Sequence, residues 1–421
     1  SFPTRRSSDL SSKVAYSNNT TWSSAFTGGI DGKAYDLSGP DDTGTKTLYY
    51  TVTSVGSYSD PVASSITTNG QAKVVLGEMS DLTGGTIDIP MRYYSDNYCN
   101  FAITEIDYRA FHIFPNLNTI RGGEYVKTIG KEAFSYCEGL TTVNFPNLVS
   151  IDEDAFEDCK NMTSFNLGNR LESIGSGAFS LCKALTGEIS LPATVSFIGS
   201  SAFSNCTGLQ SMFINRTEPF TFERDFFPSH IDGFVLYVPL NLFYDIYTKM
   251  KSVVYTAYPT TTPKKVLPWV KPTTQWTALS VPVDDNVLLP ASGEFYIATT
   301  YSRPHSSLIK TRLNNDKGIK GYEGMLMKGT VGTIYRFRPK TAVSDYVYIE
   351  PSGNLLKGVT GASQTLSNST SGPWNYTFSG TDRFNRVLSS QTLPSGMAYV
   401  QLTSDDLGPI SPVPAVYIDN T

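Results

Sequence analysis

Charged side chains are scarce in this chain, and histidine is nearly missing. Asp, Glu, Lys and Arg make up 17% of its 421 residues, and there are 3 histidines. The net charge is −5, and no basic stretch of the kind that binds nucleic-acid phosphates or anionic lipids is visible. We therefore expect no nucleic-acid partner.

Long apolar runs are also lacking. The most apolar stretch, Phe234 to Phe243, is interrupted by Pro239 and Asn241 and is far shorter than the roughly 20 residues of a helical span. We expect no transmembrane span in this chain. Residues 1–10 have neither the apolar core nor the cleavage-site pattern of a signal peptide, so we interpret them as a non-native or disordered leader.

Residues that carry catalysis are few and dispersed. His112, His230 and His305 fall in three different parts of the chain. No His-x-x-x-His pair, nucleophile elbow, phosphate-binding loop or dinucleotide-binding glycine pattern is present. We predict that the protein is not an enzyme and that it holds no cofactor.

What the chain does contain is a repeat. Four copies of the pattern Ile-x-x-x-Ala-Phe-x-x-Cys start at Ile129, Ile151, Ile174 and Ile198, in steps of 22, 23 and 24 residues. A weaker copy starts at Ile106, with Phe114 in the place of Cys. Self-similarity at one period predicts a solenoid of at least five stacked coils.

Each repeat also contains an alternating apolar and polar segment, such as Leu140 to Pro146, which predicts a short strand with one buried face. We expect these strands to pair in parallel, with Ala and Phe on a short helical turn opposite them. The side chains expected to point outward form two columns, and this face is the candidate binding surface: Thr119, Arg121, Thr142, Asn144, Ser164, Asn166, Glu188, Ser190, Ser211 and Phe213. An ordinary solvated sheet face is the competing interpretation.

Four of the five cysteines occupy the same place in successive coils. Stacking would spread their sulfurs along a line of about 15 Å, whereas zinc needs ligands that converge on one point. We therefore predict free, buried thiols and no metal site. The acidic group at 152–154 could suggest a calcium loop or a glycosidase, but it occupies the bend of one repeat, which favours a solvated turn.

The pattern Ile-Gly-x-x-Ala-Phe-x-x-Cys-x-x-Leu resembles the leucine-rich repeats of the BspA type, which are common on surface proteins of Bacteroidetes and some protozoa. The resemblance covers about residues 30–258 and implies a β-rich N-terminal cap, a closing strand at Leu236 to Pro239 and a capping helix at Leu242 to Met250. It also implies a location at the cell surface or outside the cell.

The C-terminal third differs in texture. Four prolines in 259–274 favour a semi-rigid linker, and from Trp276 onward short runs rich in Val, Tyr, Phe and Thr favour an antiparallel sandwich or barrel. Segments such as Gly324 to Gly332 resemble a C-terminal β-domain of Bacteroidetes surface proteins. The fold class is thus mainly β with short helices: leader 1–10, cap 11–104, solenoid 105–258, linker 259–274 and a separate sandwich-like domain 275–421.

Three classes of function remain open. The first is a non-enzymatic surface or secreted adhesion protein, monomeric, that contacts an extracellular protein or glycan ligand. The second is an accessory carbohydrate-binding or structural module of a surface glycan-utilisation system, for which exposed Trp and Tyr on the β-domain would be the distinguishing observation. The third is an enzyme, which would need converging carboxylates or a nucleophile and base.

Overall fold

The computed structural model describes most of the chain after residue 98 and several strands before it. The described residues are 36–40, 47–54, 70–77, 85–89, 92–95, 99–223, 225–228, 233–256, 265–282, 286–316, 318–339, 353–408 and 412–418. The interpreted leader at 1–10 lies outside them. The chain divides into two compact units: unit 1 is 1–187, 194–209 and 220–230, and unit 2 is 188–193, 210–219 and 231–421.

Unit 1 opens with strands, as the sequence predicts. They are β1 (Asp36–Pro40), β2 (Thr47–Ser54), β3 (Gly70–Gly77), β4 (Gly85–Ile89), β5 (Arg92–Ser95) and β6 (Cys99–Ile106). Strand β2 pairs antiparallel with β1 and β3, and β6 pairs antiparallel with β5 and parallel with β3. All except β4 belong to a ten-stranded sheet, sheet A, which continues into the repeats.

Each repeat adds one two-residue strand to sheet A. These strands are β8 (Thr128–Ile129), β10 (Ser150–Ile151), β12 (Ser173–Ile174), β14 (Phe197–Ile198) and β16 (Thr221–Phe222). They pair in parallel and in register, so that the isoleucines that start the repeats form one buried ladder. The register also aligns Phe222 with Ile198, which adds a coil to the five recognised in the sequence.

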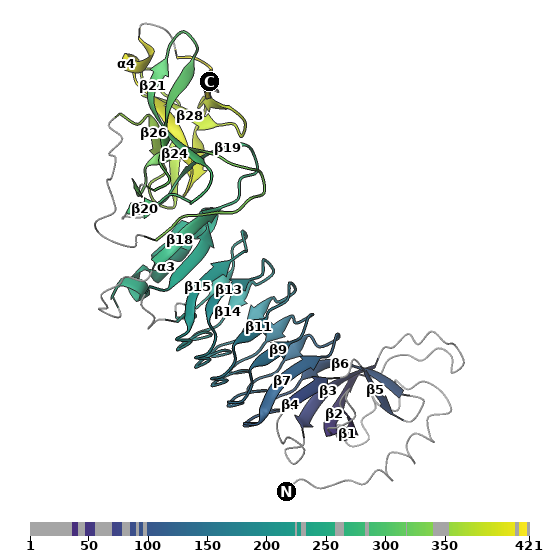
Figure 1. Cartoon of the computed structure of the whole chain (residues 1–421). Helices are drawn as coiled ribbons and strands as arrows, with labels where there is room; N and C mark the ends of the chain where they lie inside the picture. The colour runs from purple at the N-terminus through teal and green to yellow at the C-terminus, as the bar shows by residue number, and fades with distance from the viewer. Residues whose placement is uncertain are drawn as a thin grey trace, which may run out of the picture. The chain divides into compact units, whose positions relative to one another are not determined.

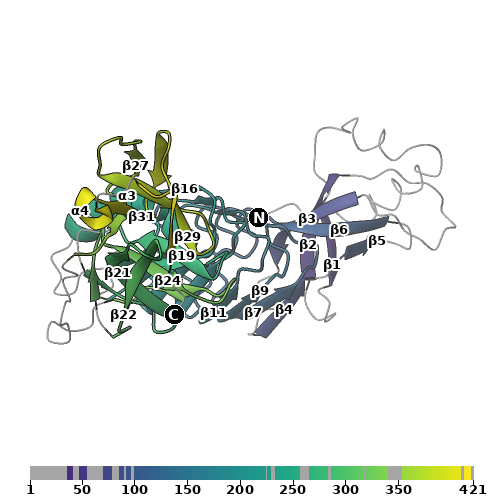
Figure 2. The same cartoon turned by 90° about the horizontal axis from the view of Figure 1, so that it is seen from above.

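The alternating segments form a second sheet, sheet B, with order β11-β9-β7-β4. It contains β7 (Leu117–Gly122), β9 (Thr142–Asn144) and β11 (Ser164–Asn166), all paired in parallel. Figures 1 and 2 both show β4, β7, β9 and β11 side by side. The strands therefore confirm the predicted repeat, and β4 extends the row one coil further upstream than the sequence indicates.

The core of the coils is built from the repeated Phe and Cys. Phe111, Phe134, Phe156, Phe179 and Phe203 are stacked nearly parallel, with ring centroids 5.1–5.4 Å apart. Each repeat cysteine is buried, and its thiol donates to the carbonyl oxygen of a Phe in the preceding coil at 2.9–3.1 Å. The repeated Phe and the repeated Cys therefore each form a buried column, and the prediction of free, buried thiols is confirmed for these four cysteines.

The turn that carries Ala and Phe is not a helix. Its backbone N–H groups alternate between two acceptors: His112 donates to Arg109 in its own turn, whereas Phe111 donates to Ala133 in the next coil. Residues at two positions of each turn, such as Arg109 and Ile113, have positive φ angles of 52° and 60°. The predicted helical turn was wrong, because every second N–H group of the turn donates to the next coil and is not available for the hydrogen bonds within a helix.

Unit 2 contains a five-stranded sheet, sheet C, with order β13-β15-β17-β18-β25. Its strands are β13 (Gly187–Leu191), β15 (Leu209–Ile214), β17 (Val235–Pro239), β18 (Lys265–Val270) and β25 (Tyr335–Arg336). The predicted closing strand and helix are present as β17 and α3 (Leu240–Thr256). Residues 265–270, inside the expected linker, instead form β18, which pairs parallel with β17 and antiparallel with β25.

The remaining strands of unit 2 form sheet D, with order β19-β24-β21-β22-β32-β29-β28-β31-β26. They are β19 (Trp276–Ser280), β21 (Glu294–Ser302), β22 (Ser307–Leu313), β24 (Gly324–Lys328), β26 (Leu356–Gly358), β28 (Trp374–Phe378), β29 (Arg383–Arg386), β31 (Ala398–Leu402) and β32 (Ala415–Ile418). Two small pairs join β20 (Asn286–Leu288) to β23 (Gly318–Lys320) and β27 (Ser363–Leu366) to β30 (Gln391–Pro394). A short helix, α4 (Ser404–Leu407), follows β31.

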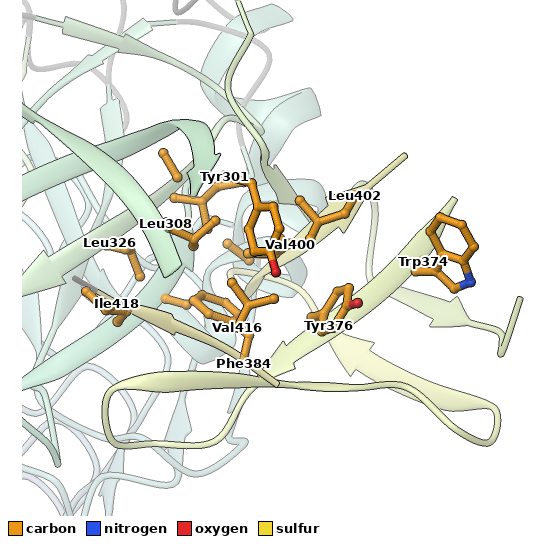
Figure 3. Packing of buried hydrophobic residues seen from close by; sticks show 14 of the residues in the cluster. Tyr301, Leu308, Leu326, Trp374, Tyr376, Phe384, Val400, Leu402, Val416 and Ile418 are labelled. Carbon is orange, nitrogen blue, oxygen red and sulfur yellow. The ribbon is translucent and has the colours of Figure 1, made fainter. Parts of the chain in front are cut away.

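Sheet D is a nearly closed barrel, the alternative that the strand pattern left open, and not the sandwich-like domain assigned in the fold class. Single bridges join Leu279 to Met397 and Glu323 to Lys357, and these bring the two ends of the sheet together. Its interior is filled by a cluster that includes Tyr376, Phe384, Val400 and Val416 (Figure 3). One sheet that curls on itself buries this cluster from all sides, so no second sheet is needed.

Candidate functional site

The polar face of sheet B consists of two columns in register. Thr86, Thr119, Thr142 and Ser164 form the first, and Asp88, Arg121, Asn144 and Asn166 form the second. Arg121, Asn144, Ser164 and Asn166 are exposed, while Thr119 and Thr142 are half-buried. The structure thus brings together the six predicted residues of unit 1, on a regular lattice set by strand pairing.

Arg121 does not stand alone on this face. Its Nε donates to Asp88 Oδ1 at 2.6 Å. Asp88 was missed in the sequence because β4 precedes the first recognisable repeat. An ion pair this exposed adds little stability, but it fixes the direction of the guanidinium across the sheet.

Asn166 has a structural role of its own. Its Oδ1 accepts a hydrogen bond from the backbone N–H of Gly168 at 3.0 Å, and Gly168 has a φ of 61°. The side chain therefore holds the turn that leaves β11. Asn144 and Ser164 are the exposed positions of the face at which a substitution disturbs the fold least.

The other predicted residues lie in unit 2, on sheet C. Glu188 and Ser190 are exposed on β13, and Ser211 donates to Glu188 at 3.1 Å. Phe213, which the sequence placed outward, is only 3% exposed. That assignment was wrong because the ring packs against Trp269 of β18, with centroids 5.3 Å apart.

Arg336 covers the same part of sheet C. Its guanidinium carbon lies 4.2 Å from the ring centroid of Phe213 and 5.1 Å from that of Tyr237. Its two terminal nitrogens donate to the carboxylate of Glu188 at 2.6 and 3.1 Å. Burial is the main cause that raises the pKa of Tyr237. These contacts occupy Glu188 and Phe213, and no signal in the sequence linked Arg336 to strands so far upstream.

The repeat thiols are poorly suited to metal binding or nucleophilic attack. Burial raises the pKa of Cys137 and of Cys206 to about 12, and it raises those of Cys159 and Cys182 as well. Within the described residues, no group of three or more His, Cys, Asp or Glu side chains could hold a metal ion. The side chain of Cys99 lies outside the described set.

The histidines and the acidic bend show no catalytic arrangement in the described residues. His112 packs edge-on against Tyr136 at 5.8 Å, His305 is exposed, and His230 lies outside the described residues. In the bend at 152–154, Glu153 pairs with Lys131 at 2.9 Å. Burial is the main cause that raises the pKa values of Asp152 and Asp154.

Neither a membrane helix nor an exposed tryptophan platform is found in the described part of the chain. No helix there is both long enough and apolar enough to cross a bilayer. Trp269, Trp276 and Trp374 are 2%, 3% and 8% exposed, and Trp22 lies outside the described residues. Of the described tyrosines in 275–421, Tyr417 of β32 is exposed, at 42%. Among the described residues, the exposed Trp and Tyr that would favour a carbohydrate-binding β-domain are thus represented by Tyr417 alone.

Comparison with known proteins agrees with the repeat geometry. Residues 104–229 match the model of the BspA type leucine rich repeat region, in six copies. The repeats are of the BspA type. The matched region extends to residue 229 and so includes β16. No curated protein matches the chain.

Several solved bacterial structures are similar to part of the chain. A leucine rich repeat protein of T. pallidum is 21% identical over 46% of this chain and 90% of its own, with a TM-score of 0.32. A leucine-rich repeat protein from Bacteroides ovatus is 21% identical over 43% of this chain and 58% of its own, also with a TM-score of 0.32. A leucine rich cell surface protein from Faecalibacterium prausnitzii is 18% identical over 49% of this chain and 64% of its own, with a TM-score of 0.28.

Proposed function

We propose that this chain is a non-enzymatic binding or adhesion protein of the cell surface or of the secreted fraction. The observation that carries the proposal is the face of sheet B, where polar side chains stand in two registered columns on a BspA-type repeat scaffold. Such a sheet offers a broad, regular surface that suits a protein or glycan partner. The six residues of this face in unit 1 are the proposed contact residues.

The proposal assigns ligand contact to the surface and no chemistry to the interior. The buried thiols are neutral, and the described histidines have no partner set for proton transfer. Screens with glycosides, esters and peptides as substrates should give only background rates. Turnover that survives removal of contaminants and scales with protein concentration would contradict this part of the proposal.

An array of glycans and extracellular-matrix proteins, probed with the purified chain, tests the binding role. We expect saturable binding to one class of array component, with the monomer as the binding species. A chain denatured by heat provides the control for adhesion that does not depend on the fold. Binding that is equal for folded and denatured protein, or absent from every component, would contradict a role as a surface binding protein.

A further inference from the structure

A second surface of the repeats lies on the turns that connect sheet A to sheet B. In the first two coils, Tyr108, Ile113 and Tyr136 are 51%, 52% and 41% exposed. His112 precedes Ile113 in the chain and packs edge-on against Tyr136. The backbone N–H of Ile113 donates to Ser135, which places Ile113 beside the turn of Tyr136. Contiguous exposed apolar side chains of this kind mark interaction sites.

The backbone conformation of Ile113 and Tyr136 also supports an interaction site on these turns. Ile113 and Tyr136 are equivalent residues of successive turns, and both have φ of 60°. A β-branched residue pays for this conformation in steric strain, which Asn or Asp largely avoids. Later coils have Asp158 and Asn205 at the same place. Among the described non-glycine residues with positive φ, Ile113 and Tyr136 are the exposed apolar ones, whereas Leu181, at the equivalent place in its own coil, is half-buried.

Four carboxylates act on the phenol of Tyr136. The pKa of its phenol is raised chiefly by the charge of Glu157, then by burial, and further by Asp158, Asp154 and Glu132. Glu132 is already paired with Arg109. Asp154, Glu157 and Asp158 form no ion pair with any described residue, although Lys131 acts on the pKa of Asp154 and Ser135 Oγ donates to Glu157 at 3.4 Å. Every charge that shifts the pKa of Tyr136 belongs to a carboxylate, which indicates a negative field at the phenol.

We propose that this turn surface, made of Tyr108, His112, Ile113, Tyr136, Asp154, Glu157 and Asp158, binds a cationic, partly apolar segment of a partner protein. A Lys or Arg side chain of the partner lies over the Tyr136 ring and faces the three carboxylates, while an apolar neighbour packs on Ile113. The proposal rests on the role of the chain as a binding scaffold, but it assigns a face other than sheet B.

Charge decides between the candidate occupants. Neutral sugars can donate hydroxyl hydrogen bonds to the three carboxylates but bring no positive charge to balance them, and acidic glycans are repelled by them. A metal ion needs converging ligands, and the described residues contain no such group. A basic protein segment satisfies both halves of the surface at once, the exposed apolar side chains and the unpaired negative charge.

The test uses the whole chain and two synthetic peptides of twelve residues. One contains four Lys, four Leu and four Ser, and the other has Glu at each Lys position. Fluorescence anisotropy at low and physiological salt should show that the Lys peptide binds at least about tenfold more tightly, with affinity that falls as salt rises. Equal binding of the two peptides, or no binding of the Lys peptide, would overturn the proposal.

Two variants locate the site. Ile113→Asn with Tyr136→Asn removes the apolar half, and Glu157→Gln with Asp158→Asn removes the charge. Asn suits a positive φ, so the first variant should keep or raise the melting temperature. Each should weaken Lys-peptide binding by about fivefold or more. A matched pair on sheet B, Asn144→Arg with Ser164→Arg, should not weaken it beyond a general charge effect.

The same variants separate this proposal from the function on which it rests. If both turn variants bind the Lys peptide as the unmodified chain does, the turn surface is not the site, whatever the array shows. If the array finds a partner that the sheet B variant loses and the turn variants keep, the scaffold role stands without this surface.

Discussion

At the residue scale, stacked phenylalanines carry the interior of the coils. The column could be predicted from the sequence because Ala-Phe and Cys recur at fixed offsets. Residues at the same offset take equivalent positions in successive stacked coils. Phe156 is fully buried and lies between Phe134 and Phe179, nearly parallel to both. Its loss removes contacts with two coils at once.

We expect Phe156→Ala to lower the free energy of unfolding by about 3–5 kcal/mol, because it opens a cavity between coils that stack rigidly. Chemical denaturation followed by circular dichroism measures this. Phe156→Leu, which fills part of the space, should cost clearly less. A cost below about 1 kcal/mol for the Ala variant would show that the column does not support the fold.

Sequence reasoning failed at Phe213 for a physical reason. Alternation along a strand tells which side chains share a face, but not whether another segment covers that face. Trp269 and Arg336 lie on strands far along the chain, so the repeat pattern did not predict their contacts with Phe213. The candidate site could thus be predicted where sheet B is open and not where sheet C is covered.

The buried thiols give a prediction with a pH window. Folding raises the pKa of Cys137 and Cys206 from 9.0 to about 12, so the folded state binds protons that the unfolded state releases. Their contribution to stability is complete below about pH 9 and falls as pH rises toward 12. Denaturation midpoints between pH 7 and 11 should therefore decline above about pH 9, and Cys137→Ala with Cys206→Ala should reduce the decline.

A thiol reagent tests the same cysteines directly. The four repeat thiols should be unreactive in the folded chain because they are buried and neutral. The denatured, unreduced chain should titrate as five free thiols. A count of one or fewer would mean that the row is cross-linked.

At the element scale, the repeat strands were predictable and the closing elements were less so. Strands β7, β9 and β11 follow from alternation, and α3 follows from an amphipathic run. The sixth coil escaped detection because Phe222 and Phe226 stand where earlier coils have Ile and Ala. The four prolines of 259–274 led to the prediction of a linker, although Pro268 lies within β18.

Glycine stands at the bend before three of the turns, as Gly130, Gly175 and Gly199, where the backbone of the preceding coil comes very close. A Cβ on Gly175 would lie 2.5 Å from the carbonyl carbon of Asp152 and 2.5 Å from the nitrogen of Glu153. Both atoms belong to the backbone of the preceding coil, which cannot move aside alone. We expect Gly175→Ala to destabilise the chain by about 1–3 kcal/mol, measured by urea denaturation. The neighbouring control, Ser176→Ala, should stay within about 0.5 kcal/mol of the unmodified chain.

Arg336 should stabilise sheet C as a clamp, both by its charge and by the fit of its planar guanidinium to Glu188 and Phe213. A double-mutant cycle of Arg336→Ala and Glu188→Gln should give a coupling energy of about 0.5–1 kcal/mol, modest because both side chains are about a third exposed. Arg336→Lys should not restore the coupling, because an ammonium cannot form the two parallel bonds or lie flat on Phe213. Full recovery with Lys would reduce the clamp to a simple charge effect.

At the scale of the whole molecule, the sequence indicated a mainly β chain with a repeat region and a second β-rich part. It could not show that sheet D curls into a barrel. Short alternating strands look alike in a sandwich and in a barrel, and the difference lies in bridges such as Leu279 to Met397, which join distant segments. The domain boundaries assigned from composition remain predictions.

The central claim is that the open face of sheet B contacts a partner. Asn144→Arg with Ser164→Arg tests it best, because both residues are exposed and Asn166, which holds a turn, is left intact. Glu172→Arg, just before β12 of sheet A, adds the same two units of charge elsewhere and serves as the control.

The measurement is the affinity of these two variants for the component selected on the array, made alongside their melting curves. The account predicts that the sheet B variant loses about tenfold or more in affinity, because two bulky cations displace contacts on the neighbouring strands β9 and β11 of the face. Its melting temperature and the affinity of the Glu172 control should stay unchanged. Full affinity in the sheet B variant, with melting unaltered, would contradict the claim and move the site away from the repeat strands.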